Sequence, residues 1–208
     1  MNGGEYVRAL PRAQMTAGLY TTRYALGVFD RDCCQRILDV GCGDAFFEER
    51  YPRRFVGIDI DLDRLVGAGQ RGVVNLVLGS AESLPFPPSC FDGVLLKDVL
   101  EHFPLEQVFR ILHEVSRVLQ PRGVLVVTTT KDCQEFWDKP DHVRPYSIKW
   151  VRRVLVQELG RYELIAAREL SGGIPGFGKL RLEWLAHALA DRLGIRNTHG
   201  IIVLRIKA

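Results

Sequence analysis

The sequence predicts an α/β protein with a doubly wound, mostly parallel seven-stranded sheet whose last strand is antiparallel. Three observations support this prediction. Short apolar runs rich in β-branched residues alternate with segments of helical periodicity, which is typical of a parallel sheet covered by helices. A glycine-containing turn follows the first of these runs. No repeat, linker or low-complexity stretch interrupts the 208 residues, so one compact domain can hold the whole sheet.

Seven runs are expected to form the strands, in chain order Arg36–Val40, Phe55–Ile58, Val73–Leu78, Gly93–Leu96, Val124–Thr129, Glu163–Leu170 and Ile201–Ile206. Helical spacing of apolar residues is clearest over Leu105–Leu119. Pro104 suits the first turn of that helix, and Pro121–Gly123 predicts a turn before the next strand. Ser147 is a suitable N-cap for a helix over residues 148–159.

Two helical segments are expected outside this alternation. Residues 1–35 are predicted to form an N-terminal helical segment, with a helix over Tyr6–Val28 that packs on the domain or caps the site. Residues 36–208 are predicted to form the main domain. That domain carries a helical insertion near 171–199, in which Leu180–Leu193 is the expected helix.

Composition excludes several classes of protein. With 47% hydrophobic and 25% charged residues, the chain is too apolar for a disordered segment. No apolar run approaches the roughly 18 residues that a membrane span requires. The N-terminus shows no apolar signal core. We therefore expect a cytoplasmic protein without a membrane partner.

The five cysteines do not indicate a metal site. The cysteines are Cys33, Cys34, Cys42, Cys90 and Cys133. Their number is odd, and their spacing is not that of paired metal ligands. Reduced thiols in a cytosolic protein explain this pattern. We predict no metal centre.

The net charge of +3 is unevenly distributed. Residues 140–208 hold 12 Lys+Arg against 6 Asp+Glu, whereas the preceding residues are net acidic. A basic C-terminal third suits an anionic partner. An Arg-rich solvated surface would give the same pattern.

The most informative stretch is 37–46, where an apolar run leads into Gly41-Cys42-Gly43. Glycine permits unusual dihedral angles and lets the backbone approach a ligand closely. A dinucleotide site requires a third glycine three residues after Gly43, but Phe46 occupies that position. Asp44 also stands where the diphosphate would lie. The acidic residues around this loop favour instead a ligand with cationic groups: Asp39, Asp44, Glu48 and Glu49.

A carboxylate residue follows the next apolar run, Phe55–Ile58. Asp59 follows Gly43 by 16 residues, where a carboxylate can accept both hydroxyls of a ribose. The ligand is therefore predicted to be a nucleoside with a positively charged substituent. Asp61 is equally suited to capping a helix over Leu62–Gln70.

These residues resemble the class I S-adenosylmethionine-dependent methyltransferase family, in particular its small-molecule type. The resemblance continues in the family's order through residues 78–86, 91–94, 99–102 and 117–123, and it covers most of residues 36–130. It implies a Rossmann-like fold, S-adenosyl-L-methionine as the cofactor, and methyl transfer as the reaction.

The resemblance also implies roles for individual residues in the first half of the site. Gly41, Cys42 and Gly43 would pass under the cofactor, with Asp39 near its amino group. Asp59 would hold the ribose.

Further along the chain, the resemblance implies that Ile60 packs on the adenine face. Ser80, Ala81 and Glu82 would line the adenine edge, with serine where the family often has aspartate. Lys97 and Asp98 would lie near the sulfonium and the acceptor. A cation at Lys97 is unfavourable there unless it points to an anion.

The acceptor side is expected in residues 136–147, where aromatic, His and Arg residues are broken by two prolines. This composition predicts an ordered loop at the mouth of the pocket. His142 is the candidate general base, Arg144 would orient an anionic acceptor, and Asp98 completes the catalytic set. The alternative is that His142 stabilises the loop and Arg144 pairs with Asp138 or Asp141.

Two further features of the sequence are interpreted as structural and not catalytic. Glu101 and His102 are expected to cap the helix that follows them. The glycine-rich segment 171–178 lacks the lysine and hydroxyl spacing of a phosphate loop, so a hinge or a plain connection is expected there.

Three functions are compatible with the sequence. The first is methylation of an oxygen or nitrogen atom of a small molecule. The second is an RNA or protein methyltransferase that uses the basic C-terminal third, although no RNA-binding module or aromatic–basic repeat is present. The third is a non-catalytic subunit that binds S-adenosylmethionine.

Overall fold

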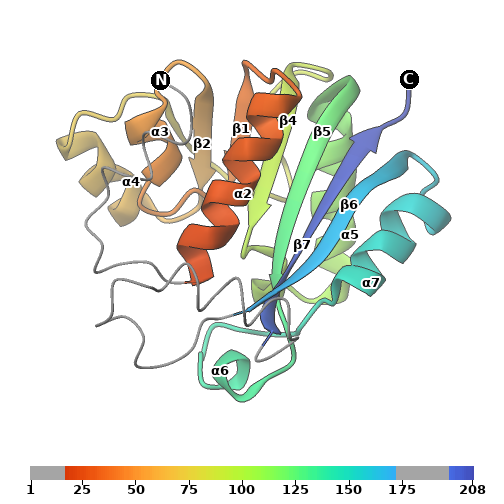
Figure 1. Cartoon of the computed structure of the whole chain (residues 1–208). Coiled ribbons are helices and arrows are strands. Elements are labelled where there is room, and N and C mark those ends of the chain that lie inside the picture. The colour runs from red at the N-terminus through yellow and green to blue at the C-terminus, as the bar shows by residue number, and fades with distance from the viewer. Residues whose placement is uncertain (1–16, 172–196) are drawn as a thin grey trace, which may run out of the picture.

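The computed structural model describes residues 17–171 and 197–208 as one sheet with helices on both faces (Figure 1). The start of the predicted N-terminal helix and the predicted helix Leu180–Leu193 lie outside the described residues. The glycine-rich segment after Ser171 also lies outside them.

The sheet has seven strands in the order β3-β2-β1-β4-β5-β7-β6. Their bounds are β1 Ile37–Val40, β2 Phe55–Asp59, β3 Leu76–Leu78, β4 Phe91–Lys97, β5 Leu119–Thr130, β6 Tyr162–Ser171 and β7 Asn197–Ile206. The pairs among β1 to β5 are parallel, whereas β7 is antiparallel to both β5 and β6. The predicted fold class is confirmed.

The strand order reverses at β1. The chain first builds β2 and β3 on one side of this strand and then places β4 on the other. In doubly wound sheets a ligand binds outside the carboxyl ends of the strands at such a switch point. The site is therefore expected where β1 and β4 end.

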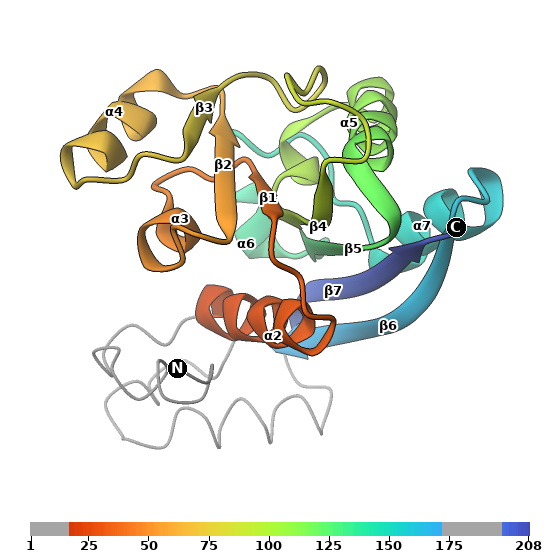
Figure 2. The same cartoon turned by 90° about the horizontal axis from the view of Figure 1, so that it is seen from above.

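The helices divide between the two faces of the sheet. Their bounds are α2 Ala17–Arg31, α3 Phe46–Arg50, α4 Leu62–Gln70, η2 Leu100–His102, α5 Leu105–Val118, α6 Gln134–Trp137, α7 Ile148–Arg152 and η3 Arg153–Glu158. Figure 2 shows α2 and α5 on opposite faces of the sheet. A hydrophobic core lies on each face of the sheet. Successive residues of β1 point into opposite cores, because side chains alternate along a strand. Ile37 belongs to one buried cluster with Phe29 of α2, and Leu38 belongs to the other with Leu112 of α5.

Two strands differ from their predicted bounds. The expected strand Val73–Leu78 keeps only Leu76–Leu78, because Val73 packs with Ala68 of α4 instead. Strand β5 begins at Leu119, before the predicted turn. The turn residues form an irregularity in its pairing with β4, since Phe91 pairs with Leu119 but Gly93 pairs with Val124.

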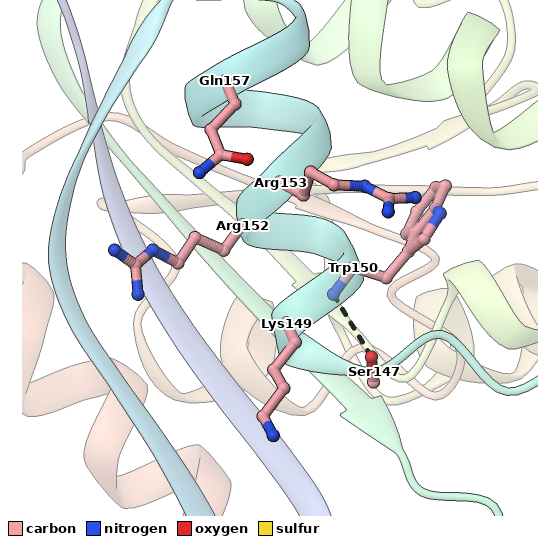
Figure 3. A pocket seen from close by; sticks show the side chains of 6 residues that line it. All are labelled: Ser147, Lys149, Trp150, Arg152, Arg153 and Gln157. Atoms are coloured by element: carbon pink, nitrogen blue, oxygen red, sulfur yellow. Dashed lines mark hydrogen bonds between the residues drawn. The ribbon is translucent and has the colours of Figure 1, made fainter.

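The helix predicted over 148–159 begins as α7 and continues as the π-helical η3. Ser147 caps it, because its side chain accepts a hydrogen bond from the Trp150 amide at 3.2 Å. Figure 3 shows the cap, the Arg153 side chain beside Trp150, and Lys149 and Arg152 pointing away from that ring.

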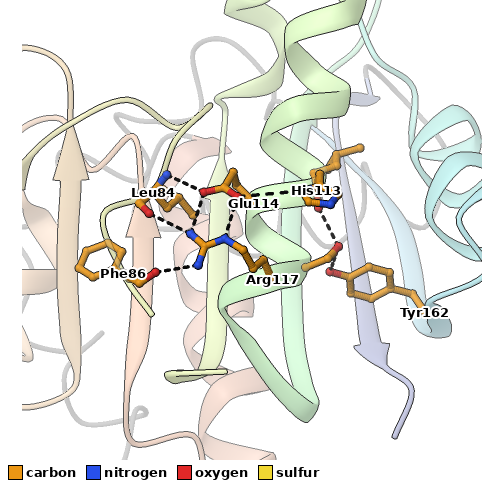
Figure 4. A network of polar contacts seen from close by, with 8 residues as sticks. Leu84, Phe86, His113, Glu114, Arg117 and Tyr162 are labelled. Carbon is orange, nitrogen blue, oxygen red and sulfur yellow. Dashed lines mark hydrogen bonds and ion pairs between the residues drawn. The ribbon is translucent and has the colours of Figure 1, made fainter. Parts of the chain in front are cut away.

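The segment after β3 is fastened to α5 by a polar network (Figure 4). Arg117 donates to the carbonyl oxygens of Leu84 and Phe86 at 2.9 and 2.8 Å. Glu114 accepts from the Leu84 amide at 2.8 Å and also binds the Arg117 guanidinium. Burial would raise the pKa of the Glu114 carboxyl, but the hydrogen bonds from Arg117 outweigh it and lower that pKa. Residues 84–86 are thus held in place from α5.

Candidate functional site

The turn after β1 requires glycine at two positions. Gly41 has φ +72° and Gly43 has φ +53°, a region that favours glycine. A Cβ atom at Gly41 would lie 2.8 Å from Cγ2 of Val99. The amides of Gly41 and Cys42 both donate to the Ile58 carbonyl, at 2.8 and 3.1 Å. The turn is therefore bound tightly to the end of β2.

Asp59 lies against this turn. One of its carboxylate oxygens accepts from the Gly43 amide at 2.7 Å, and the other accepts from the Asp61 amide at 2.9 Å. Each carboxylate oxygen can accept a further hydrogen bond. Gly43 and Asp59, which are 16 residues apart in the sequence, are thus in direct contact. Asp61 itself caps α4 by accepting from the Arg64 amide at 3.1 Å.

Apolar side chains stand exposed beside Asp59. Ile60 is 75% exposed and Leu78, at the end of β3, is 54% exposed. Ser80 and Ala81 follow β3 and are half-buried. The carboxylate of Glu82 is bound by Arg110 through Nε at 2.8 Å and Nη2 at 2.7 Å. This edge combines an apolar surface with a fixed acidic group.

Two buried carboxyl groups lie beneath the turn. Asp39 on β1 is 3% exposed and Glu48 on α3 is fully buried. Neither oxygen of Glu48 has a hydrogen-bond partner among the described residues. Burial raises the pKa of Glu48 to about 7. Burial and then repulsion by Glu48 also raise the pKa of Asp39 well above its usual range.

Other residues near the turn have different surroundings. Burial and the neighbouring acidic groups raise the pKa of Cys42, so its thiol stays protonated and unreactive. Asp44 and Glu49 are exposed, and Glu49 pairs with Arg71 at 3.3 Å. The buried acidic pair is therefore Asp39 with Glu48.

Lys97 and Asp98 end β4 as an ion pair, with Nζ 2.9 Å from Oδ2. Thr128 on β5 donates to Asp98 Oδ1 at 2.7 Å. Burial would raise the pKa of Asp98, but Lys97 and Thr128 outweigh it and lower that pKa. The charge of Lys97 is thus directed at Asp98. Asp98 has φ +55°, a strained conformation for a residue other than glycine.

The loop of residues 136–147, which is predicted to face the acceptor and is called the acceptor loop below, contains His142 and Arg144. The ring of His142 packs on Phe136 and His102, with centroids 4.5 and 5.0 Å apart. Burial, Lys139 and His102 lower the pKa of His142. Arg144 lies over the ring of Tyr146 at 5.7 Å, and it pairs with no carboxylate among the described residues. The predicted alternative in which Arg144 pairs with Asp138 or Asp141 is not what this loop shows.

Glu101 and His102 do not cap α5, whose N-cap is Pro104 with no side-chain hydrogen bond. Glu101 is buried and accepts from the Thr130 hydroxyl at 2.8 Å. His102 lies against Asp141 of the acceptor loop, with Nδ1 3.3 Å from Oδ2. Helix capping was therefore the wrong interpretation of both residues.

Comparison with known proteins agrees with this geometry. Residues 38–127 match the family model described as a methyltransferase domain. A fatty-acid O-methyltransferase of Mycolicibacterium smegmatis is 30% identical over 136 residues, which are 59% of this chain and 48% of that protein. The chain thus spans about half the length of this curated relative.

Solved structures show the same fold. An S-adenosylmethionine-dependent methyltransferase from Archaeoglobus fulgidus superposes with a TM-score of 0.68 at 19% identity, over 91% of this chain and 94% of that one. The N-methyltransferase NodS of Bradyrhizobium japonicum, in complex with S-adenosyl-L-homocysteine, gives 0.64 at 16% identity over 92% and 86%. Residues 38–127 thus resemble a methyltransferase domain, and the chain shares its fold with methyltransferases of known structure.

S-adenosylmethionine is the cofactor that the sequence resemblance implies, and the residues present suit it. The buried carboxyl groups of Glu48 and Asp39 suit a cationic ligand, because a neighbouring cation favours the ionised form that burial disfavours. Asp59 supplies acceptors for hydroxyl groups. Among residues 17–171 and 197–208, no helix is long and apolar enough to cross a membrane.

The fold brings most of the predicted residues together at the carboxyl ends of β1, β2 and β4. Sequence reasoning missed two features. The burial of Glu48 follows from Gly57, where a Cβ atom would lie 2.9 Å from the Glu48 carboxyl carbon. The contact between His102 and Asp141 joins residues 39 positions apart, and no local pattern marks it.

Proposed function

We propose that this protein transfers the methyl group of S-adenosylmethionine to an oxygen or nitrogen atom of a small-molecule acceptor. The observation that carries the proposal is the acidic surround of the glycine turn, with Asp59 bound to it and Asp39 and Glu48 buried beneath it. A nucleoside with cationic groups complements these charges. A cationic group favours the ionised form of the two buried carboxyl groups, whereas a diphosphate would oppose their ionisation.

In this proposal the cofactor lies over Gly41, Cys42 and Gly43. Asp59 accepts hydrogen bonds from the ribose hydroxyls, and Asp39 lies nearest the cofactor ammonium.

The adenine end completes the cofactor site. The exposed side chain of Ile60 would cover one face of the ring. Ser80, Ala81 and Glu82 would line its edge. Lys97, already paired with Asp98, would add little net charge near the sulfonium.

The acceptor would bind between Asp98 and the loop of residues 136–147. Methyl transfer needs an in-line approach to the methyl carbon, so this chain's contribution is orientation and exclusion of water. Arg144, with no carboxylate partner among the described residues, is suited to an anionic group of the acceptor. The curated relative that is a fatty-acid O-methyltransferase supports an acceptor of this kind.

His142 provides the first test. His142→Ala is expected to lower turnover at least tenfold while leaving cofactor affinity within about twofold, because the ring lies on the acceptor loop and away from the glycine turn. The measurement is transfer of a labelled methyl group to panels of fatty acids, phenols and amines, with cofactor affinity from calorimetry. Unchanged turnover with an accepted substrate would remove His142 from the mechanism.

One surface favours the alternative function, methylation of RNA. A groove of about 520 Å³ along α7 and η3 is lined by Ser147, Lys149, Trp150, Arg152, Arg153 and Gln157 (Figure 3). A groove that combines basic side chains with an aromatic ring suits RNA, although Arg153, the basic residue beside Trp150, pairs with Glu158 at 3.2 Å. Methyl transfer to RNA with steeply salt-dependent binding would favour this function. Cofactor binding without transfer to any acceptor would favour the non-catalytic subunit.

A further inference from the structure

Three side chains with metal-binding atoms meet on the acceptor side. His102 ends η2, and Asp141 and His142 lie in the loop between α6 and α7. One ligand atom from each lies within 4.8 Å of the other two. We propose that these three residues bind a divalent transition-metal ion.

The donor set suits such an ion. Two imidazoles and one carboxylate are typical ligands of Zn²⁺ and Fe²⁺. Ligand atoms about 2.0–2.2 Å from Zn²⁺ lie roughly 3–4 Å from one another. Nδ1 of His102 already lies 3.3 Å from Oδ2 of Asp141. Small side-chain rotations would bring His142 to the same spacing.

A buried nitrogen of His142 supports the proposal independently. Its Nδ1 atom has no hydrogen-bond partner among the described residues. Buried polar atoms nearly always have a partner, and an ion absent from the coordinates is one recognised reason for an exception. An ion bound through Nδ1 would supply the missing interaction.

Besides the contact of His102 Nδ1 with the Asp141 carbonyl at 3.1 Å, other hydrogen bonds hold the two segments together. The amides of Val143 and Arg144 donate to the Glu101 carbonyl at 2.8 and 3.2 Å. The Tyr146 hydroxyl donates to the Phe103 carbonyl at 2.9 Å. These bonds fix the loop against η2, so the ligands are positioned before an ion arrives.

The site is open on one side. Asp141 is exposed and the two histidines are half-buried. Three protein ligands leave at least one coordination position free, as in catalytic rather than structural sites. A carboxylate or hydroxyl oxygen could occupy that position. Its assignment to the methyl acceptor rests on the proposed function, whereas binding of the ion does not.

Binding of Co²⁺ and Zn²⁺ to the full chain, after removal of metals with a chelator, tests the proposal without any methyl transfer. Calorimetry is expected to show one ion per chain. His102→Ala, Asp141→Ala and His142→Ala should each weaken binding about 100-fold or more, since loss of even an outer partner costs 10–100-fold. The matched control is His113→Ala, because His113 lies on α5 with its side chain 65% exposed. Its affinity should equal that of the wild type.

The absorption spectrum of bound Co²⁺ identifies the ligands. Imidazole and carboxylate ligation gives no thiolate charge-transfer band, whereas binding to the free cysteines would produce one. Circular dichroism confirms that each variant is folded. A variant that is not folded is replaced by the conservative change at the same position, which is His102→Gln, Asp141→Asn or His142→Gln. Absence of saturable binding, a thiolate band, or equal affinity in wild type and all three ligand variants would each overturn the proposal.

Discussion

Burial of a carboxyl group is the residue-scale feature with the clearest consequence. Glu48 has a folded-state pKa of about 7, against an ordinary value of 4.5 in the unfolded chain. The folded state therefore holds the proton more tightly between these two values, and the free energy of unfolding falls as pH rises from about 4.5 to 7. The pKa of Asp39 is raised in the same direction.

Glu48→Gln should remove much of this dependence, because the amide does not titrate. We expect the fall in the free energy of unfolding between pH 5 and 7 to shrink on the order of 2 kcal/mol. Urea denaturation across this range measures it. The control is the exposed Glu49→Gln, which should follow the wild-type curve. An unchanged pH slope in Glu48→Gln would show that this carboxyl titrates normally.

At the scale of elements, α5 supports the cofactor side through Arg117. This side chain satisfies two carbonyl oxygens in the segment 84–86 and pairs with Glu114. Residues 80–82, which precede this segment, are proposed to line adenine. The stability of the helix–loop contact and the affinity for the cofactor should therefore be linked.

Arg117→Met is expected to lower the free energy of unfolding by about 1–3 kcal/mol, because it leaves Glu114 and two carbonyl groups without their partner. Cofactor affinity should fall several-fold as the loop loosens. Chemical denaturation and calorimetry measure the two effects, with the exposed Arg152→Met as the control. Wild-type stability in Arg117→Met would contradict the role given to this network.

At the scale of the whole molecule, local patterns predicted the sheet and the contact of Asp59 with the glycine turn. Buried parallel strands are short apolar runs, and the glycine turn and Asp59 occur at fixed positions in such folds. The bounds of β3 were less predictable because Val73 is equally apolar but packs on α4. The irregular start of β5 arises from its pairing with β4.

The acceptor half was less predictable for a physical reason. Methyl transfer from a sulfonium imposes no obligatory residue type, so no motif marks the groups that carry it. His102 and Asp141 come together only because backbone bonds join the acceptor loop to Glu101. Likewise, the burial of Glu48 on α3 depends on Gly57 of β2, where the absence of a side chain leaves room for the carboxyl group. Contacts of this kind depend on the tertiary fold.

Calorimetric titration with S-adenosylmethionine, S-adenosylhomocysteine and NAD tests the central claim most directly. The account predicts saturable binding of the first two and none of NAD. Asp59→Ala should weaken binding at least 100-fold, because it removes the carboxylate proposed to accept charge-assisted hydrogen bonds from the ribose. The exposed Asp63→Ala should bind as the wild type does. Tight binding of NAD, or undiminished affinity for S-adenosylmethionine in Asp59→Ala, would contradict the account.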